Sequence, residues 1–353
     1  MLLSRCFFLD REGKMLLRSR APVRVDFAGG WTDVALFAQD SPGYVVNAAL
    51  NIYSYATIVR AKSGGEAKRG INIYSSDFDL YVEAEDIRKL EYDGNIDLAK
   101  AAVKRMKMDT GLTMITQSVA PPGSGLGTSA SMGVALIAAL ARLSDQRMLR
   151  YEMAELASLI EREELGILGG KQDHYASALG GIRFMEFRGD EVKTSQLTLS
   201  RDTRLELEKN LLLVYTGKSR LSGDIHSKVT GAWRAREPET TDAIRQLKRI
   251  TVEMKEALLG GDLEAFGRLM NENWQQQKRL HPSVTNAQIE SLFERAYAEG
   301  ALGGKACGAG GGGCLLFYCR PDSEHKVQRA LEGQGVRTID FNFDDLGVQT
   351  WEA

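Results

Sequence analysis

The stretch from Pro121 to Ser131, PPGSGLGTSAS, constrains this chain more than any other feature. It places three glycines, one threonine and three serines directly before the apolar run Met132 to Leu140. Residues without bulky side chains let successive backbone N–H groups converge on an anion, and the positive end of a following helix adds to the attraction. The stretch therefore predicts a phosphate cradle at the start of a helix. A flexible linker that ends in a helix N-cap has the same composition and stays open on this feature alone.

The loop follows neither of the two commonest nucleotide-binding patterns. A Walker loop requires a lysine after its last glycine, and this loop has none. The GxGxxG pattern requires a third glycine three residues after the second, but Gly127 is followed by Thr128-Ser129-Ala130. We infer a phosphate loop of a third kind.

Length and charge narrow the classes of partner. A chain of 353 residues with 43% hydrophobic residues has room for two domains. Its net charge of −2 gives no electrostatic footprint for nucleic acid or an anionic membrane, so we expect neither as a partner. The first twenty residues mix charges among apolar residues, unlike a signal peptide, and Met132 to Ala141 is shorter than the roughly 20 residues that span a bilayer. We expect a cytoplasmic protein.

The cysteines indicate core positions rather than ligands. Their spacing matches no zinc or redox pattern, and Cys314 and Cys319 lie five residues apart in a strand-like run, where their side chains would point to opposite faces. Buried free thiols are the favoured interpretation for all four, which include Cys6 and Cys307.

Periodicity predicts a mixed chain of strands and helices. Strands are expected at 16–27, 44–59, 70–82, 182–187, 211–215, 314–319 and 336–343. Helices are expected at 96–108, 129–143, 151–164, 238–259, 263–280 and 283–300, with Gly303-Gly304 closing the last. A polar stretch at 188–204 suggests a domain boundary. We therefore predict an N-terminal domain at 16–195 and a C-terminal domain at 205–353.

Two further motifs accompany the phosphate loop. The tract KACGAGGGGC, which begins at Lys305, supplies five glycines before a strand, and such clustering suggests a close approach of backbone to a ligand or to another loop; a mobile hairpin tip is the alternative. The segment Ala21 to Asp33, APVRVDFAGGWTD, joins a strand carrying Arg24 to a Gly-Gly turn and a carboxylate. A carboxylate can accept hydrogen bonds from sugar hydroxyls, and an arginine can stabilise phosphoryl charge or a catalytic carboxylate, although a surface ion pair beside a tight turn would look the same.

The three motifs, taken in their order along the chain, resemble those of the GHMP small-molecule kinases. The resemblance extends over nearly the whole chain. The resemblance implies a mixed α+β fold of two domains. The N-terminal domain would contain a left-handed βαβ unit, which general topology would not predict, and the C-terminal domain would be ferredoxin-like. ATP and a small-molecule substrate would meet in the cleft between the domains. The resemblance leaves a homodimer open.

The resemblance also implies roles in binding ATP and Mg²⁺. Ser129 and Glu161 would meet the metal, with Glu163 and Glu164 as competitors of Glu161, since Mg²⁺ prefers oxygen ligands. A solvated helix face is the alternative role for each of these glutamates. The expected nucleotide-binding residues are Pro122, Gly123, Ser124, Gly125, Leu126, Gly127, Thr128, Ser129, Gly310 and Gly311.

Asp173, in GGKQDHYAS, matches the catalytic aspartate of the family. It would take the proton from the attacking hydroxyl, while Arg24 holds it ionised. Capping of the helix that follows is the alternative role. The adjacent His174 is expected to be structural or to lie at the rim of the site.

The acceptor is expected at Gly30, Trp31, Thr32, Asp33, Lys171 and Gly312. GGWTD replaces the GEHTD typical of galactokinases, which disfavours galactose. Together with GGKQDxY it resembles the heptose-7-phosphate kinases, which phosphorylate an anomeric hydroxyl. Trp31, where that subgroup has glycine, would stack on a sugar or fill a gap in the core. Candidate cations for a 7-phosphate are Lys171, Lys218, Arg220 and His226. Kinases of fucose, arabinose or similar sugars, and a non-catalytic sugar-binding protein, remain open.

Overall fold

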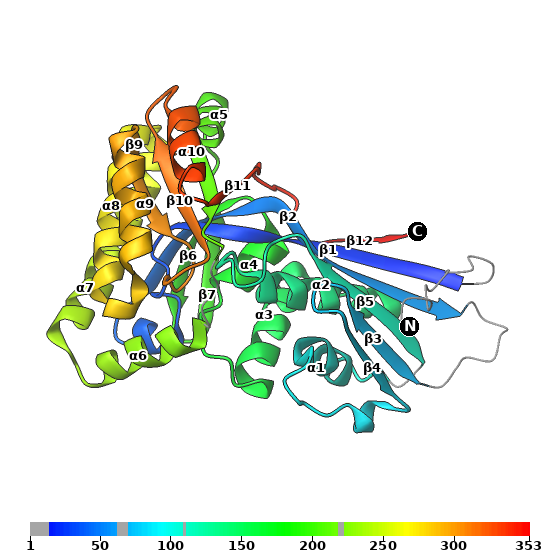
Figure 1. The fold of residues 1–353 in the computed structure, drawn as a ribbon. Helices are drawn as coiled ribbons and strands as arrows, with labels where there is room; N and C mark the ends of the chain where they lie inside the picture. The colour runs from blue at the N-terminus through cyan, green and yellow to red at the C-terminus, as the bar shows by residue number, and fades with distance from the viewer. Residues whose placement is uncertain (1–13, 62–69, 109–110, 218–221) are drawn as a thin grey trace.

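The computed structural model describes residues 14–61, 70–108, 111–217 and 222–353 (Figure 1). Its strands are β1 (Lys14–Ala28), β2 (Gly43–Ala61), β3 (Ile71–Ser75), β4 (Leu80–Ala84), β5 (Leu112–Ser118), β6 (Ile182–Arg188), β7 (Glu191–Gln196), β8 (Leu211–Tyr215), β9 (Ala301–Ala306), β10 (Cys314–Cys319), β11 (Arg337–Ile339) and β12 (Gln349–Glu352). Its α-helices are α1 (Asp97–Arg105), α2 (Thr128–Leu143), α3 (Arg150–Leu159), α4 (Gln172–Leu179), α5 (Arg201–Asn210), α6 (Ser222–Arg234), α7 (Pro238–Gly260), α8 (Leu263–Arg279), α9 (Ala287–Ala298) and α10 (Glu324–Glu332). Short turns of helix are η1 (Ala35–Ala38), η2 (Ile87–Lys89) and η4 (Pro282–Val284), which are 3-10, and η3 (Ile160–Glu164), which is π-helical.

The first lobe is built on a large mixed sheet. Its strand order is β12-β1-β2-β5-β3-β4, and β6 joins β2 on one side and β7 on the other. Most neighbours are antiparallel, but β3 and β5 run parallel, and the chain between them passes through β4 and α1. This is the pair for which the resemblance implies a left-handed connection.

Helix α2 forms the centre of the first lobe. Nearly all its residues are buried, and it packs on β1 and β2, with α1, α3 and α4 around it. A helix that is apolar on all sides is stable only when it is enclosed in this way. Its first turn is thereby fixed directly behind the glycine loop that precedes it.

The second lobe is ferredoxin-like, as the resemblance implied. Its sheet has the order β11-β8-β10-β9 with every neighbouring pair antiparallel, and the chain runs β8, helices, β9, β10, α10, β11. Helices α6 to α9 stand where the simplest form of this fold has one helix. Helices α8 and α9 lie beside β9 (Figure 1).

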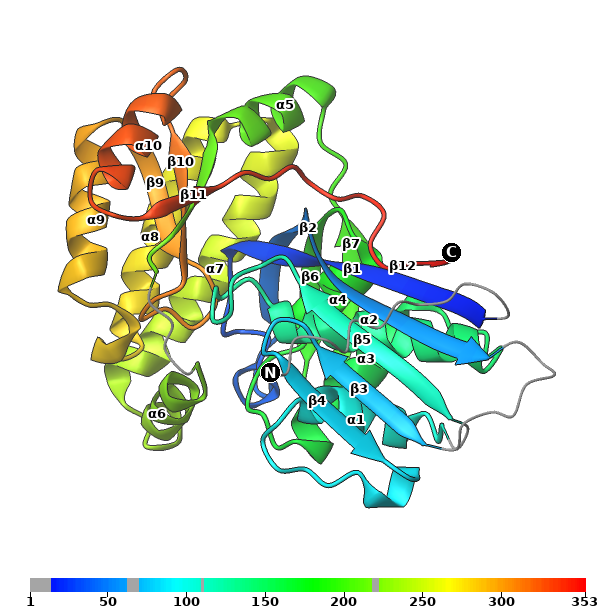
Figure 2. The same cartoon turned by 45° about the vertical axis from the view of Figure 1, so that its right-hand side comes forward.

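An apolar core joins the two lobes. Val23 and Phe27 of β1 cluster with Leu213 and Leu316 from the second sheet, and the ring of Phe27 meets that of Phe266 of α8 edge to face at 5.2 Å. The end of the chain also crosses between lobes, since β12 pairs with residues 17–20 of β1 (Figure 2). The predicted C-terminal domain at 205–353 thus contains one strand of the first sheet.

Several element predictions need correction. The run at 70–82 is a hairpin of β3 and β4 rather than one strand, and the polar stretch at 188–204 contains β7 and the start of α5. Gly303 and Gly304 do not close a helix but lie inside β9. A Cβ on Gly303 would stand 1.8 Å from the carbonyl oxygen of Gly267, so glycine at this position lets α8 approach the strand closely.

The cysteine prediction is confirmed for the described residues. Cys307, Cys314 and Cys319 are buried and unpaired, and burial raises the pKa of the Cys307 thiol to about 12. Cys6 lies outside the described residues. Among the described helices, none is both long and apolar enough to cross a membrane.

Candidate active site

A cavity of about 320 Å³ lies where the two lobes meet, and it gathers residues from all three sequence motifs. Its walls are formed by Arg24, Asp26, Gly30, Trp31, Asp33, Gly123, Ser124, Gly125, Gly127, Thr128, Ser129, Ala130, Glu161, Ile167, Leu168, Gly169, Gly170, Gln172, Asp173, His174, His226, Gly308 and Ala309.

The phosphate loop contributes backbone that only glycine adopts easily. Gly123, Gly125 and Gly127 have φ values of 65°, 76° and 73°. A Cβ on Gly125 would stand 2.6 Å from the carbonyl oxygen of Cys307, and one on Gly127 would stand 3.0 Å from Asp173 Oδ2. Glycine is therefore needed for two reasons, the left-handed conformation and the close approach of a neighbouring segment. Gly127 is also the N-cap of α2, so the positive end of this helix faces the cavity.

Arg24 and Asp173 form a bidentate ion pair at the centre of the cavity. Nε and Nη2 of Arg24 each donate to one oxygen of Asp173, both at 2.7 Å, and Nη1 donates to the carbonyl oxygen of Gly125 at 2.6 Å. Burial opposes the positive charge, yet the nearby carboxylates of Asp173 and Asp26 raise the pKa of Arg24 above its ordinary value. One arginine thus links the predicted catalytic carboxylate to the phosphate loop. The N-cap of α4 is Lys171, and Asp173 lies in the first turn of the helix, where its carboxylate binds Arg24 instead of capping the helix.

Asp33 is another carboxylate of the cavity, and within the described part of the chain no lysine, arginine or histidine forms an ion pair with it. It is 4% exposed and accepts hydrogen bonds from the backbone N–H of Gln172 at 3.2 Å and from Gln172 Nε2 at 3.3 Å. Burial, together with the nearby negative charge of Asp173, raises the pKa of Asp33 to about 7. Asp33 therefore exchanges its proton near neutral pH and can act as either donor or acceptor to a bound hydroxyl.

Ser129 and Glu161 are in direct contact, since the Ser129 hydroxyl donates to Glu161 Oε1. The other oxygen of Glu161 lies 2.8 Å from His174 Nε2, and both side chains are buried. Burial alone would raise the pKa of Glu161, but His174 and Ser129 outweigh it and hold this pKa below its ordinary value.

The competing glutamates are placed elsewhere. Glu163 is exposed, and Glu164 pairs with Arg105 at 3.5 Å and with the Tyr92 hydroxyl at 3.2 Å. Of the three glutamates, Glu161 alone lines the cavity.

Trp31 is held in an unusual conformation. Its φ of 83° is left-handed, which costs a residue with a bulky side chain about 1–3 kcal/mol. Its ring packs against that of His226 of α6, with the centroids 4.4 Å apart and the planes tilted by 35°, and its Nε1 is buried without a hydrogen-bond partner among the described residues. Burial lowers the pKa of His226, although Asp173 partly opposes this, so the imidazole is mainly neutral at pH 7.

Other predicted residues support the cavity from behind. The Thr32 hydroxyl lies 2.8 Å from the carbonyl oxygen of Gly29 and 2.7 Å from that of Tyr44, and it accepts the N–H of Tyr44, so it braces the turn. Leu126 is buried in the core between the lobes, and its carbonyl accepts the N–H of Arg24 at 2.9 Å. Pro122 does not line the cavity.

The C-terminal glycine tract reaches the cavity at Gly308 and Ala309, rather than at the predicted Gly310 to Gly312. A Cβ on Gly310 would stand 2.5 Å from the carbonyl oxygen of Val284, and the N–H of Gly311 donates to that oxygen at 2.7 Å. The tract also supports the phosphate loop, since Cys314 N–H donates to the carbonyl oxygen of Ser124 at 2.7 Å.

Two of the four predicted phosphate-binding cations, Lys171 and His226, belong to the described residues, and of these two His226 lines the cavity. Lys171 is 3% exposed, and its amine lies 2.7 Å from Glu155 and 2.8 Å from the carbonyl oxygen of Asp190, away from the cavity lining. Lys218 and Arg220 lie outside the described residues. Among the described lining residues, the only lysine or arginine is Arg24, which Asp173 already engages.

Sequence reasoning missed Asp26. It is buried, its Oδ2 lies 2.5 Å from Lys305 Nζ, and its Oδ1 has no hydrogen-bond partner among the described residues. Lys305 is itself fully buried on β9, so this ion pair joins the two lobes at the cavity wall. Alternation along β1 contained the signal, since residues 24 and 26 share a face of the strand.

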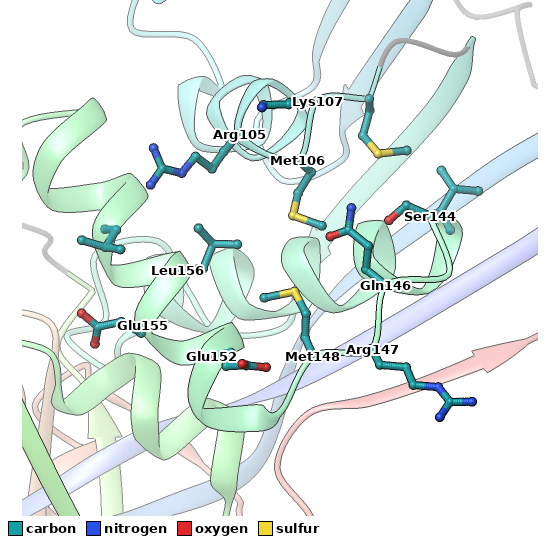
Figure 3. A pocket seen from close by; sticks show the side chains of 13 residues that line it. Arg105, Met106, Lys107, Ser144, Gln146, Arg147, Met148, Glu152, Glu155 and Leu156 are labelled. Atoms are coloured by element: carbon teal, nitrogen blue, oxygen red, sulfur yellow. The ribbon is translucent and has the colours of Figure 1, made fainter.

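A second cavity of about 750 Å³ lies between the ends of α1 and α2 and the helix α3 (Figure 3). Met106, Met148 and Leu156 line it, with Glu155 at its edge. It contains none of the predicted site residues, so the smaller cavity is the candidate active site.

Comparison with known proteins agrees with this geometry. The family described as the GHMP kinases N terminal domain matches residues 97–181, and GHMP kinases C terminal matches residues 254–337. A D-glycero-alpha-D-manno-heptose 7-phosphate kinase from Campylobacter jejuni is 33% identical over 95% of this chain and 98% of that protein. The chain belongs to the GHMP kinase family.

Two further relatives bear on the acceptor. The crystal structure of a D-glycero-D-manno-heptose 1-phosphate kinase from Bacteroides thetaiotaomicron has a TM-score of 0.78 and 31% identity, covering 96% of this chain and 99% of that one. A bifunctional fucokinase/GDP-fucose pyrophosphorylase from Arabidopsis thaliana is 30% identical over 87% of this chain, which corresponds to 30% of its own length. The relatives share the family but differ in the acceptor for which they are named.

Proposed function

We propose that this protein transfers the γ-phosphoryl group of ATP to the anomeric hydroxyl of D-glycero-D-manno-heptose 7-phosphate and forms the 1,7-bisphosphate. The observation that carries the proposal is the Arg24–Asp173 pair, which holds a carboxylate directly beside the phosphate loop. The similarity to the heptose 7-phosphate kinase, over nearly the full length of both chains, supports this choice of acceptor.

The loop from Gly123 to Ser129 would hold the phosphates of ATP. Its glycines turn backbone toward the cavity, Ser124, Thr128 and Ser129 line it with hydroxyls, and α2 begins there. Phosphoryl transfer depends mainly on positioning and on stabilising charge, which such a loop provides without covalent chemistry.

Ser129 and Glu161 would hold Mg²⁺. The fit is favourable because a hydroxyl and a carboxylate oxygen already converge on the cavity wall, and Mg²⁺ takes oxygen ligands, usually one or two protein carboxylates with phosphates and water. The described residues contain no group of three or more His, Cys, Asp or Glu that could hold a metal, so phosphates and water would supply the other ligands. When bound, the metal would offset charge on the β- and γ-phosphates.

Asp173 would accept the proton of the anomeric hydroxyl. The oxygen of this hydroxyl attacks the γ-phosphorus of ATP, the bond from the γ-phosphorus to the bridging oxygen breaks, and ADP leaves. Arg24 orients this carboxylate and favours its charged form. A strongly basic group is not required, because in a loose transition state the hydroxyl is deprotonated late.

Asp33, Gly30 and Trp31 would receive the sugar. A Cβ on Gly30 would stand 2.5 Å from Asp26 Oδ2, so glycine keeps this part of the wall open. The 7-phosphate would need a cation, and of the predicted candidates Lys218 and Arg220 remain for this role, with His226 as a neutral donor.

A coupled ADP-release assay with a panel of sugars tests the proposal. We expect turnover with heptose 7-phosphate and at least tenfold lower kcat/KM with unphosphorylated heptose, since each lost 1.4 kcal/mol of binding is tenfold. In K218A/R220A the preference for the phosphorylated sugar should shrink. Turnover of unphosphorylated sugars alone would refute the heptose phosphate assignment.

Kinases of fucose or a similar sugar are the second candidate. The fucokinase relative, and the absence of a free lysine or arginine among the described lining residues, favour it. Turnover of L-fucose in the same panel would support a fucose kinase. A non-catalytic sugar-binding protein is a separate alternative, and it would require that the D173N variant keep its function.

We further propose that the protein acts in the cytoplasm on small molecules alone, without a nucleic-acid or membrane partner. A homodimer is the assembly to test, and sedimentation equilibrium of the purified protein would distinguish it from a monomer.

A further inference from the structure

Lys171 is buried in a site built for its ammonium group. Its side chain is 3% exposed, and Nζ donates to Glu155 Oε1 at 2.7 Å and to the carbonyl oxygen of Asp190 at 2.8 Å. The carboxylate of Asp190 lies 3.5 Å away. A buried charge is tolerated only with such partners, because an unpaired one would be strongly destabilising. All its contacts face α3 and the β6–β7 turn, not the cavity.

The three residues from Lys171 to Asp173 are each tied to a different part of the first lobe. Lys171 binds α3 and the β6–β7 turn, Gln172 binds Asp33, and Asp173 binds Arg24 of β1. Lys171 is the N-cap of α4 and makes no side-chain cap. The start of α4 is therefore positioned by three attachments that point in different directions.

Tyr175 strengthens the attachment to α3. It follows Lys171 by four residues and thus shares its face of the helix. Its hydroxyl donates to Glu155 Oε2 at 2.9 Å, so the two oxygens of Glu155 receive one donor each from α4. Asp173 is on the side of this turn that faces Arg24 and the cavity.

The same attachment reaches the segment that carries Glu161. Glu155 is on α3, which continues without a break into η3, where Glu161 lies. Arg162, the residue after Glu161, donates to Asp190 Oδ1 at 3.0 Å. The carbonyl oxygen of the same Asp190 accepts a hydrogen bond from Lys171 Nζ. Two links therefore join the start of α4 to the helix that bears the proposed metal carboxylate.

We propose that Lys171 is a positioning residue, which fixes Asp173 relative to Glu161 and does not bind the acceptor. The proposal rests on the proposed kinase function for the roles of these two carboxylates. It replaces the sequence-based prediction that Lys171 binds substrate.

The test compares K171M with K100M. Methionine keeps an unbranched side chain that is one heavy atom shorter, and it removes the charge in both. Lys100 of α1 is an equally buried lysine, 2% exposed, with Asp93, Asp97 and the carbonyl oxygen of Glu91 as partners, and it does not line the cavity. We expect K171M to lower kcat by about a hundredfold, the effect of a displacement of about 1 Å, with both KM values within twofold. K100M should keep kcat.

Different outcomes would overturn the proposal. A rise of the acceptor KM in K171M with kcat largely kept would identify Lys171 as a ligand, and an unchanged kcat per folded molecule would make its role purely structural. K171R should retain more of kcat than K171M, and equal losses of kcat in the two variants would contradict a role for the Lys171–Glu155 ion pair. Adding E155Q to K171M should lower kcat no further, and additive losses in this double variant would likewise contradict that role.

A second readout is independent of the acceptor. Amide hydrogen exchange at residues 172–175 should be faster in K171M than in the wild type and K100M, because α4 loses one of its three attachments. Unchanged exchange there would refute the positioning role even if the wild type phosphorylates a sugar other than heptose phosphate. If it does use another sugar, the kinetic comparison is made with that sugar, and only the heptose assignment fails.

Discussion

The two ends of the cavity differ in how completely their polar groups are satisfied. At the phosphate-loop end, glycines occupy the left-handed positions and Arg24 is bound by Asp173 and Gly125. At the acceptor end, Trp31 occupies a left-handed position that suits glycine, and Asp26 Oδ1 and Trp31 Nε1 have no partners among the described residues.

The difference separates two tasks. A site for a nucleotide, whose phosphates are the same in every turnover, gains from groups that are fixed beforehand. A site that must select one sugar gains from buried polar groups that only the correct ligand satisfies, because an unpaired group penalises the wrong one. We therefore expect substitutions at the two ends to change different kinetic constants.

The largest effect is expected at Asp173, where the two ends meet. D173N should lower kcat by about a thousandfold, within the range for loss of a general base, because the amide cannot accept the proton. Calorimetry with a non-hydrolysable ATP analogue should show binding within a fewfold of the wild type. Retained turnover would remove Asp173 as the base.

Gly125→Ala should affect the nucleotide end alone. The added Cβ would stand 2.6 Å from the carbonyl oxygen of Cys307, and we expect the KM for ATP to rise by about tenfold, or 1.4 kcal/mol. Gly94→Ala is the matched control, since Gly94 also has a positive φ, 87°, but its Cβ would meet nothing within 4 Å. An equal rise in both variants would show that backbone strain, and not contact with the glycine tract, is responsible.

Trp31→Gly should affect the acceptor end. It relieves a strained φ but removes the ring contact with His226, so we expect the KM for the sugar to rise by roughly fivefold, or about 1 kcal/mol, with the KM for ATP unchanged. Trp31→Phe keeps a ring beside His226 and should show a smaller change. If the KM for ATP rose instead, the proposed division between the two ends would be wrong.

The last prediction concerns the pH dependence of folding stability, not a kinetic constant, and it involves Asp33. Its pKa is raised from 3.8 to about 7 in the folded protein, so the folded state binds more protons than the unfolded state between these values. The contribution of Asp33 to the free energy of unfolding is therefore present at low pH and is lost as pH rises toward 7. Urea unfolding of wild type and D33N from pH 4 to 8 should show the wild type losing stability relative to the variant up to about pH 7. Parallel curves would contradict the raised pKa.

The sequence predicted the positions of most elements because their periodicity is strong. Helix α2 and strand β1 begin and end within two residues of expectation. The phosphate loop was therefore already attached to the correct helix, and Glu161 fell in the stretch predicted as helix at 151–164, where it lies in the π-helical turn η3. Asp173 was expected just before a helix and lies instead in the first turn of α4. Strand β7 and helix α5 were missed, because they are polar and gain their stability from neighbours distant in sequence.

The details of the site depended on packing that no local pattern contains. Lys171 stands two residues before Asp173 in sequence and was assigned to the cavity, but its partners, Glu155 and Asp190, are 16 and 19 residues away. Packing likewise decides that Gly308 and Ala309, and not Gly310 to Gly312, line the cavity. Val284 occupies the space beside the later glycines. By contrast, alternation along β1 could have identified Asp26.

The return of β12 to β1 limits when one edge of the first sheet can form during translation. Residues 349–352 pair with residues 17–20, so a ribosome must extend the chain from residue 20 to residue 349 before this edge of β1 gains its partner. Until then the nascent first sheet exposes unpaired backbone groups, the feature that invites pairing with other chains. Residues 349–352 therefore protect an edge of the sheet that β1 leaves open for as long as they are missing.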